Sequence, residues 1–480
     1  MQGQVHSLAG FLWSAPLVML CIGAGLFFSL ATRFVQVRYF REMLAQMLGK
    51  ASDSKAGISS FQSLMLGLSG RLGTGNIAGI ATAIAMGGPG AIFWMWVIAF
   101  LGAGSAFAES TLGQLYKTKE QGEYRGGPAY YIEKGLGLRW YAVLFSCAIL
   151  TSYIVFLPGV QANAITVALD EAFGLPPVVV GLGIIVSLAI LLRTGVQGFA
   201  KFSQVVIPFM TLGYLVVVWV IIGLNVREVP GALRLIVASA LGAEQVFAGI
   251  VGTAMSYGVR RGVFSTEAGL GTQVSAAAAA ETKHPVSQGL VQAFSIYIDT
   301  FLVSTSTAVM LLVTGAYNVL RGANGTEGYL VEQLPGVNHA GPGFTIEAVE
   351  GVFAGWGSGL IAVAIFFFAY TTFVTYYYVA QTNLVYVFRG RKVRWLHHLM
   401  EVLFLFFIFR GSVLPSEGAW AMADIGVGLS AWINLVAILL LWRPLMGCFR
   451  DYEAQLRAGR SPVFVADKAG IKGTDWWRAH

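Results

Sequence analysis

Charged residues are scarce in this chain of 480 residues. Lys, Arg, Asp and Glu make up 11% of it, against about 25% in soluble domains. The hydrophobic set AVILMFWYC contributes 56%, which exceeds the roughly 45–50% that soluble domains reach even with glycine included. A soluble globule of this size could not cover its surface with so few charges. The composition therefore excludes that class, and it also excludes disordered and collagen-like chains.

Cysteine is scarce as well. The three cysteines, Cys21, Cys147 and Cys448, lie far apart, and each is inside or beside an apolar run. An odd and scattered set excludes a disulfide scaffold, so we interpret them as small core residues.

Motifs of soluble catalysis are also missing. No GxxxxGK[ST] string is present, which excludes a pump driven by a P-loop ATPase, and no HExxH or metal-spaced His/Cys/Asp cluster occurs. We therefore predict that the chain is not an enzyme and needs no cofactor. A membrane-embedded enzyme and a passive channel stay open as alternatives, and a channel is recognised by its inability to accumulate a solute against its gradient.

What the chain does contain is a series of apolar runs long enough to cross a hydrocarbon core, which takes about 20 residues. Eleven such runs predict an all-α polytopic membrane protein with about 11 transmembrane helices. We expect the first run to be retained as a helix, because no Lys or Arg precedes it and it is longer than the core of a signal peptide. The predicted spans are 11–31, 61–86, 90–116, 141–160, 176–192, 204–223, 244–270, 286–315, 354–388, 395–412 and 418–446.

The basic residues predict the orientation of these spans. With the amino terminus outside, 24 of the 31 Lys and Arg fall in inner segments and four in outer loops, as the positive-inside rule requires. The carboxyl terminus is then cytoplasmic, and the tail after about residue 449 reads as a solvated or partly disordered end. The net charge of +7 is explained by anionic membrane lipid, so no nucleic-acid partner is predicted.

Six charged residues fall inside or beside predicted spans. Charges at that depth usually face a protein interior or a water-filled cavity. Counted from the helix ends, all six lie in or near the cytoplasmic half, which predicts an internal ion-pair network; the alternative is that some reach the interface as long side chains. These residues are Arg71, Glu109, Arg260, Arg261, Glu267 and Asp299.

A glycine cluster interrupts the second span. Gly70, Gly73 and Gly75 occur within six residues, and each glycine costs about 1 kcal/mol in a helix, so we predict an unwound segment in the membrane. Its amides would suit an anion and its carbonyls a bare cation. The GTGNIAG string lacks the βαβ context of a dinucleotide site, whereas close helix packing through Gly75 and Gly79 is compatible with a break.

A second cluster, Ser256 to Gly271, predicts another break five spans later. Broken helices in corresponding positions indicate a transporter built from inverted repeats. The predicted units are residues 1–60 (first helix and linker), 61–223 (first five-helix repeat), 224–446 (second repeat) and 447–480 (tail). In the ninth span, adjacent Thr371 and Thr372 either complete an oxygen cage for sodium or bond carbonyls of their own helix.

Several ordered blocks resemble those of the alanine or glycine:cation symporter family, the bacterial sodium:alanine symporters. They are GTGNIAG, GGPGAIFWMWVIAFLG, RGGPAYYIEKGL, RGVFSTEAGLG, HPVSQGLVQ and FFFAYTT, which span about residues 60 to 385. The resemblance implies a LeuT-like core of two inverted five-helix repeats, a bacterial plasma (inner) membrane location, and sodium-coupled uptake of alanine or glycine. A proton-coupled or uncoupled small amino acid carrier is the alternative.

The resemblance also implies site residues. The family pattern places Thr74, Gly75 and Asn76 at the substrate carboxylate, Ser256, Tyr257 and Gly258 near its ammonium group, and Phe367 beside it. Gly70, Gly73, Thr371 and Thr372 correspond to the sodium site. Gln161 and Asn163, expected just after the fourth span, match a polar pair usual in the family, as site or as scaffold. Thr266 departs from the family pattern, which more often has Asn.

Overall fold

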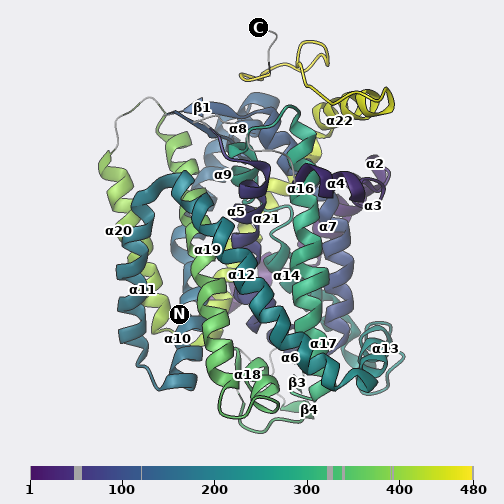
Figure 1. The fold of residues 1–480 in the computed structure, drawn as a ribbon, viewed down its shortest axis with the longest axis vertical. Helices are drawn as coiled ribbons and strands as arrows, with labels where there is room; N and C mark the ends of the chain where they lie inside the picture. Colours follow the sequence, from purple (N-terminus) through teal and green to yellow (C-terminus); the bar gives the residue numbers. More distant parts are fainter. Residues whose placement is uncertain are drawn as a thin grey trace.

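The computed structural model describes residues 2–47, 57–120, 122–321, 328–337, 341–389, 391 and 394–477. Four basic residues counted above in the inner segments lie outside the described residues: Lys50, Lys55, Lys392 and Arg478. Helices packed side by side form a bundle, and short hairpins lie at its two ends (Figure 1).

The first half of the chain contains the helices α1 to α13 and the short helical turns η1 to η5. In order, they are α1 (Gln2–Leu12), α2 (Ala15–Ala31), α3 (Val35–Arg38), α4 (Phe40–Met47), α5 (Ser60–Arg71), η1 (Thr74–Asn76), α6 (Ala78–Gly87), α7 (Gly90–Leu115), α8 (Pro128–Tyr131), the π-helix η2 (Ile132–Leu136), α9 (Arg139–Thr151), the π-helix η3 (Ser152–Phe156), α10 (Pro158–Phe173), α11 (Pro177–Leu191), η4 (Leu192–Thr194), α12 (Gly195–Leu224), η5 (Val226–Glu228) and α13 (Val229–Ala240).

The second half continues the same pattern to the tail. Its helices are η6 (Ala248–Ile250), α14 (Val251–Thr266), α15 (Val274–Ala279), α16 (Pro285–Ile296), the π-helix η7 (Tyr297–Ser304), α17 (Thr305–Thr314), α18 (Gly343–Glu350), α19 (Gly357–Val387), α20 (Arg394–Ser412), α21 (Ser416–Leu440) and α22 (Trp442–Arg457). Two antiparallel hairpins pair β1 (Thr118–Glu120) with β2 (Glu123–Arg125) and β3 (Asn318–Leu320) with β4 (Tyr329–Glu332).

Seven helical segments of the described chain are long and apolar enough to cross a membrane, and one of them, Pro177–Leu224, covers two of the predicted spans. The two broken helices and α20 are not among the seven, so the number of eleven spans stays a prediction.

The predicted end of the fourth span was wrong. The fourth span was expected to end at residue 160, but the helix continues through a π-turn to Phe173, so Gln161 and Asn163 lie within it.

Both predicted breaks are present. The first helix opens with a capping box between Ser59 and Gln62 and stops at Arg71, after which η1 and α6 restart it. The second break begins later than expected: α14 remains helical from Val251 to Thr266, and the non-helical stretch is 267–273. It contains Glu267, Gly269 and Gly271, all with positive φ.

The two broken helices run antiparallel, as inverted repeats require. A Cβ at Gly87, near the end of α6, would lie 3.0 Å from Ala254 in the first turns of α14. A Cβ at Gly75 would instead lie 3.2 Å from Phe264, near the end of α14. Higher residue numbers on one helix therefore lie beside lower residue numbers on the other, so the two helices are antiparallel. Their breaks lie close together in the middle of the bundle.

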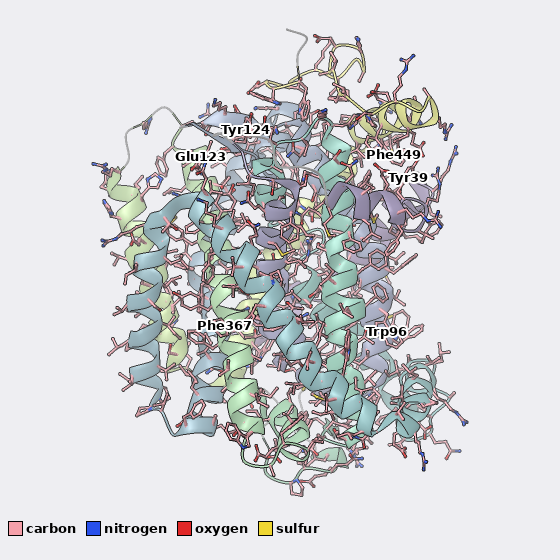
Figure 2. All side chains as sticks on the ribbon, in the orientation of Figure 1. Tyr39, Trp96, Glu123, Tyr124, Phe367 and Phe449 are labelled. Atoms are coloured by element: carbon pink, nitrogen blue, oxygen red, sulfur yellow. The ribbon has the colours of Figure 1, made fainter. Side chains whose placement is uncertain are left out.

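The carboxyl-terminal tail packs against one end of the bundle, opposite to β3, β4, α13 and α18 (Figure 1). Most described residues of the tail after α22 are exposed, as expected of a solvated end, but a few are packed against the bundle. Phe464 and Trp477 are buried, the Phe464 amide donates to Lys283 O at 2.9 Å, and the Trp477 indole donates to Gln114 O at 2.9 Å. Tyr124 and Phe449 lie toward the same end (Figure 2). The tail therefore ties together the ends of α7 and α16.

Lys117 is enclosed beneath this tail. Its ammonium group donates to Ala280 O at 2.9 Å and lies 4.4 Å from the Tyr124 ring and 5.3 Å from the Trp477 ring. Burial lowers the pKa of Lys117 from 10.5 to about 7, because the charged form loses its hydration, and the charge of Glu281 offsets only part of this effect.

This buried lysine predicts a pH dependence of stability. Between about pH 7 and pH 10.5 the unfolded chain binds a proton at Lys117 that the folded chain does not, so the free energy of unfolding rises with pH across that window. We expect Lys117→Met to remove this rise, as measured by the thermal unfolding midpoint in detergent at several pH values. Lys201→Met, at an exposed position of α12, should retain it. Equal slopes in both variants would contradict the prediction.

Candidate functional site

The first break presents backbone amides in the buried centre of the bundle. Gly73 adopts an extended conformation, and η1 follows it as a single 3-10 turn. The Gly73 amide donates to the Asn76 side-chain oxygen at 3.1 Å, and the Thr74 amide donates to Gln161 Oε1 at 3.2 Å. The Gly75 amide belongs to the same turn, where the first N–H groups of a helix have no helical acceptor. Amides at such a terminus attract an anion.

Three helices close around this break at van der Waals distance. A Cβ at Gly73 would lie 2.8 Å from Thr372 Oγ1 of α19 and 3.2 Å from Gln161 Oε1 of α10. A Cβ at Gly75 would meet the Phe264 ring of α14 at 3.2 Å. Only glycine fits these positions without movement of the neighbours, so the glycine cluster serves close approach as well as helix breaking.

Of the predicted sodium-site residues, the structure brings Thr372 to Gly73. The Thr371 and Thr372 hydroxyls both donate to Phe368 O, at 3.0 and 2.9 Å, which is the intrahelical bonding considered as the alternative. A hydroxyl that donates one bond keeps its lone pairs, so this bonding is compatible with a cation ligand. Gly70 is packed differently, since a Cβ there would collide with Gln273 Nε2 at 2.2 Å.

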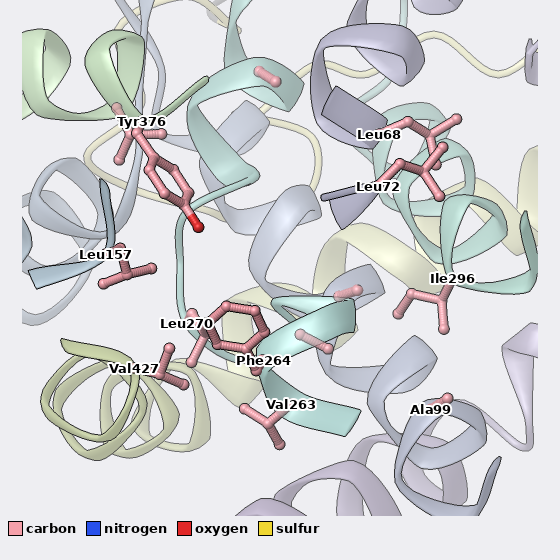
Figure 3. Packing of buried hydrophobic residues seen from close by; sticks show 14 of the residues in the cluster. Leu68, Leu72, Ala99, Leu157, Val263, Phe264, Leu270, Ile296, Tyr376 and Val427 are labelled. Atoms are coloured by element: carbon pink, nitrogen blue, oxygen red, sulfur yellow. The ribbon is translucent and has the colours of Figure 1, made fainter. Parts of the chain in front are cut away.

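Gln161 contacts the first break, whereas Asn163 contacts the backbone that follows α20. Gln161 accepts from Thr74 and donates to the Tyr376 hydroxyl at 3.3 Å, whereas Asn163 donates to Leu414 O at 2.6 Å. Figure 3 shows the Tyr376 hydroxyl directed toward Phe264 and Leu270. Sequence reasoning missed Tyr376, although its position one helical turn after Thr372 is the signal that would have found it.

Glu109 of α7 organises the second break. Its carboxylate accepts the amides of Gly269 at 3.2 Å and Gly271 at 3.0 Å, and the Asn434 side chain donates to it at 2.8 Å. Glu267, the first residue of the break, accepts hydrogen bonds from Thr272 and Gln273. The buried acids therefore satisfy backbone and side-chain donors of the unwound segment, a role that the predicted ion-pair network did not include.

Arg71 connects the ends of the two half-helices. It is the last residue of α5, and its Nε donates at 2.5 Å to the carbonyl of Thr266, the last residue of α14. The same guanidinium donates to Gln292 at 3.0 Å and to Ser295. A positive group at the carboxyl end of a helix is favourable. Thr266, the departure from the family pattern, thus contributes its carbonyl oxygen.

The single six-residue ion-pair network was wrong. Within the part of the chain that the structure describes, Arg71, Glu109, Glu267 and Asp299 form no ion pair within 4.0 Å. Two arginines instead pair with an acid that the sequence analysis did not consider. Asp424 of α21 lies 2.9 Å from Arg260 and 2.6 Å from Arg261.

The position of this arginine pair also differs from the expectation of a common depth. Gly258 and Gly262, which flank Arg260 and Arg261 in α14, approach Ala91 and Ile98 in the first turns of α7, whereas the Glu109 contacts are formed near the other end of α7. The pair therefore lies in the half of the bundle opposite to Glu109. Residue counts from uncertain helix ends could not separate these levels.

Four further predicted residues lie away from the first break. Ser256, Tyr257 and Gly258 are inside α14, so their carbonyls are in a helical segment and not in an unwound one. Phe367 lines an apolar cavity of about 570 Å³ with Phe173, Met210 and Trp356, partway along α19 (Figure 2). Neither the helical carbonyls nor Phe367 joins the residues around Gly73.

Replacing Glu109 with glutamine tests its role in the second break. Glutamine presents an NH2 group where one carboxylate oxygen accepted an amide, and an unsatisfied buried donor costs about 1–3 kcal/mol. We expect solute uptake to fall about tenfold or more, measured as initial rate per folded molecule in proteoliposomes. Glu417→Gln, at an exposed position, is the matched control. An unchanged rate in Glu109→Gln would show that the break does not depend on this charge.

Comparison with known proteins gives a consistent result. The sodium:alanine symporter family matches residues 1–466. The putative sodium/proton-dependent alanine carrier protein YrbD of Bacillus subtilis (strain 168) is 50% identical over 98% of this chain and 97% of its own length. The sodium/alanine symporter AgcS of Methanococcus maripaludis is 34% identical over 91% of this chain and 94% of its own length.

A solved structure shares the fold. The crystal structure of the manganese transporter of Eremococcus coleocola aligns with a TM-score of 0.51 at 15% identity, and the alignment covers 81% of this chain and 78% of that chain. At this identity the likeness concerns the arrangement of helices alone. Together with the two antiparallel broken helices, it confirms the predicted class of helical membrane transporter fold.

Proposed function

Because the chain belongs to the sodium:alanine symporter family, we propose that it carries alanine, and also glycine, into the cell together with sodium by alternating access. The observation that supports this proposal most strongly is the meeting of the two breaks at the buried centre. Half-helix ends at such a place offer amides to an anion and carbonyls to a cation. Both ends of a zwitterion and a coupling ion can be bound there.

We assign the substrate carboxylate to the amides of η1 at Thr74, Gly75 and Asn76. The positive end of η1 and α6 supplies a partial charge. The Thr74 amide now donates to Gln161 Oε1 at 3.2 Å and the Asn76 amide to Gly73 O at 3.3 Å, so the carboxylate would replace these two acceptors. The ring of Phe264 lies 3.2 Å from the position of a Cβ on Gly75, and we assign it as the apolar wall that the substrate side chain would contact. Steric exclusion of larger amino acids follows from this wall.

We assign sodium to the other side of the same glycine segment. The carbonyl oxygens of Gly70 and Gly73 and the hydroxyls of Thr371 and Thr372 are the proposed ligands, supported by the approach of Thr372 Oγ1 to Gly73. Because ion and substrate both bind the segment around Gly73, each favours the shape that binds the other. Their affinities then rise together, and by linkage the effect is reciprocal.

The proposed location is the bacterial plasma membrane, with the amino terminus outside and the carboxyl terminus in the cytoplasm. The predicted inner segments hold 24 of the 31 Lys and Arg, and Lys134 and Arg389, two of these residues, lie at the end of the bundle that carries the tail. An excess of basic residues at one end favours the inner leaflet and its anionic lipid.

Uptake into proteoliposomes tests the function directly. With an inward sodium gradient, we expect labelled alanine to accumulate above its external concentration, whereas an equal choline gradient should give only equilibration. Accumulation driven by a pH gradient in the absence of sodium would instead support the proton-coupled carrier. Equilibration under every gradient would contradict symport and indicate a facilitator.

The hydroxyl pair of α19 is tested by the double variant Thr371→Ala with Thr372→Ala. We expect the sodium concentration for half-maximal uptake to rise about tenfold, which corresponds to about 1.4 kcal/mol of lost ion binding, with little change in alanine affinity at saturating sodium. Thr382→Ala is the matched control, because its hydroxyl donates to Tyr378 O in the same helix at 3.0 Å. Unchanged sodium dependence in the double variant would remove both residues from the site.

A further inference from the structure

We infer that the chain after α22, residues 458–477, is a latch that joins two groups of helices at the cytoplasmic end of the bundle, and that its release lets this end open. The inference rests on the proposed alternating access and orientation. This tail segment contains no helix or strand, and it lies over the same end of the bundle as β1 and α8 (Figure 1).

The helices that the tail segment joins form two groups. In the first group, α7 packs against α14, α15 and α16. In the second group, α19 packs against α9 and α10, and α10 packs against α20. Inverted-repeat transporters alternate largely by movement of one such group against the other around a fixed site.

The boundary between the two groups is closed at the cytoplasmic end. Ser275 of α15 is buried, and its carbonyl oxygen accepts a hydrogen bond from the Tyr378 hydroxyl of α19 at 3.3 Å. The half-helices α5 and α15 are also joined, because the Ser63 hydroxyl donates to Ala276 O at 2.8 Å. Passage from Gly73 to this end of the bundle therefore requires these contacts to open.

The tail segment is attached to the first group through two hydrogen bonds and an aromatic contact. The Phe464 amide donates to Lys283 O, just before α16, at 2.9 Å. The Trp477 indole donates to Gln114 O of α7 at 2.9 Å. The rings of Phe464 and Trp477 lie 5.7 Å apart, so the two attachment points form one aromatic cluster.

The same tail segment is attached to the second group through Asp475. Its carboxylate pairs with the Lys134 ammonium group of η2 at 2.6 Å, and a Cβ at Gly473 would lie 2.7 Å from Lys134 O. The helix η2 packs against α9 and is held to the end of α19 by the ion pair of Glu133 with Arg389. Asp475 and Trp477, two positions apart, therefore bridge the two groups.

These attachments are weak enough to be released. Of residues 458–477, only Phe464, Ala466, Thr474 and Trp477 are buried. The Asp475 side chain is 50% exposed, and an ion pair at such a position adds little stability. Segments with few buried contacts open locally without unfolding of the rest. The tail segment can therefore leave one group while the helices stay folded.

A cysteine at position 275 reports opening of the boundary. Ser275→Cys is made in the full chain together with Cys147→Ser, because Cys147 is exposed whereas Cys21 and Cys448 are buried. The rate of reaction with a maleimide is measured on the purified protein in detergent. Label on Cys21 is followed at the same time, since Cys21 reacts only if the whole bundle loosens.

We expect Trp477→Ala to raise the labelling rate of the reporter about tenfold, because it removes a buried hydrogen bond of the latch. Trp395→Ala, at an exposed position of α20, is its control. Asp475→Asn should raise the rate about twofold, and Asp467→Asn, the same change at an exposed position of the tail segment, should not. Equal rates in Trp477→Ala and Trp395→Ala would overturn the inference, as would a parallel rise at Cys21.

A covalent link tests the latch in the opposite direction. Lys134→Cys with Asp475→Cys, joined by a short bifunctional methanethiosulfonate reagent, keeps Trp477 near Gln114 at high effective concentration. We expect sodium-driven alanine uptake to fall about tenfold or more and to recover after reduction, with unchanged alanine binding in detergent. Each single cysteine variant should be unaffected by the reagent.

Unchanged uptake by the linked protein would overturn the latch. A wild-type chain that accumulates no alanine under any gradient would instead refute the proposed function. The labelling of Ser275→Cys needs no transport, so it distinguishes these two failures.

Discussion

Replacement of Gly73 by alanine is expected to abolish sodium-dependent accumulation of alanine. The added methyl group would lie 2.8 Å from Thr372 Oγ1 and 3.2 Å from Gln161 Oε1, so α19 or α10 would have to move. Overpacking of this kind costs about 1–3 kcal/mol. Because Thr372 is one of the proposed sodium ligands and Gln161 accepts the Thr74 amide, a shift of about 1 Å can reduce the rate about a hundredfold.

Gly79→Ala is the matched control for this substitution. The position lies six residues further along the same broken helix, in α6, and its new methyl group would meet only Trp420 at 3.5 Å and Thr74 O at 3.8 Å. Both distances are ordinary contacts, and alanine is the better helix former by about 1 kcal/mol. Initial uptake rates and ion binding of the two variants should therefore differ sharply. Normal uptake by Gly73→Ala would show that the observed approach of α19 is not needed for transport.

Replacement of Asp424 by asparagine is expected to have the largest effect on stability. Asp424 is buried between Arg260 at 2.9 Å and Arg261 at 2.6 Å, and removal of one member of a buried charge group costs about 3–5 kcal/mol. The Arg261 guanidinium also lies 4.5 Å from the Trp420 ring, which stabilises the cation but does not neutralise it. We expect a lower thermal unfolding midpoint and less protein in the membrane.

A double variant distinguishes this electrostatic effect from a simple change of shape. In Asp424→Asn the two arginines carry two uncompensated charges, whereas Asp424→Asn with Arg261→Gln restores the net charge of the wild-type group. We expect the double variant to recover part of the lost midpoint, which a double-mutant cycle measures as a coupling energy. Asp170→Asn, at an exposed position, should change nothing. A midpoint for Asp424→Asn equal to that of Asp170→Asn would contradict the prediction.

The two breaks show which structural features can be predicted from residues that are neighbours in the sequence. The first was predicted at its position, because a dense glycine cluster disfavours a helix whatever surrounds it. The second was predicted some ten residues too early. Ser256, Tyr257 and Gly258 stay helical because α14 packs closely along α7, where a Cβ at Gly258 would lie 2.4 Å from Ala91 O. Gly258 therefore allows close packing of the two helices. The unwound segment is instead marked by the hydrogen bonds that Glu109 accepts from the amides of Gly269 and Gly271.

For the charged residues, the sequence predicted which side chains are internal but not the groups that they contact. Sequence reasoning identified six of them as internal, since an ionisable group in the membrane must be compensated. It did not identify their partners. Arg71 bonds a carbonyl and two neutral side chains, and Arg261 pairs with an acid 163 positions away in the chain. No local pattern encodes contacts at such separation, and Asp424 lay unnoticed inside an apolar run.

The sequence by itself determined the class of this protein, because composition, apolar run length and the distribution of basic residues act through the membrane and need no tertiary contact. It also determined the family and the first break, which depend on residues close together in the chain. The tertiary structure alone decided the partners of the buried polar groups. Gln161, Thr372, Ser265 and Asp299 come from four different helices, and only helix packing brings their oxygen atoms close to the segment from Gly73 to Asn76.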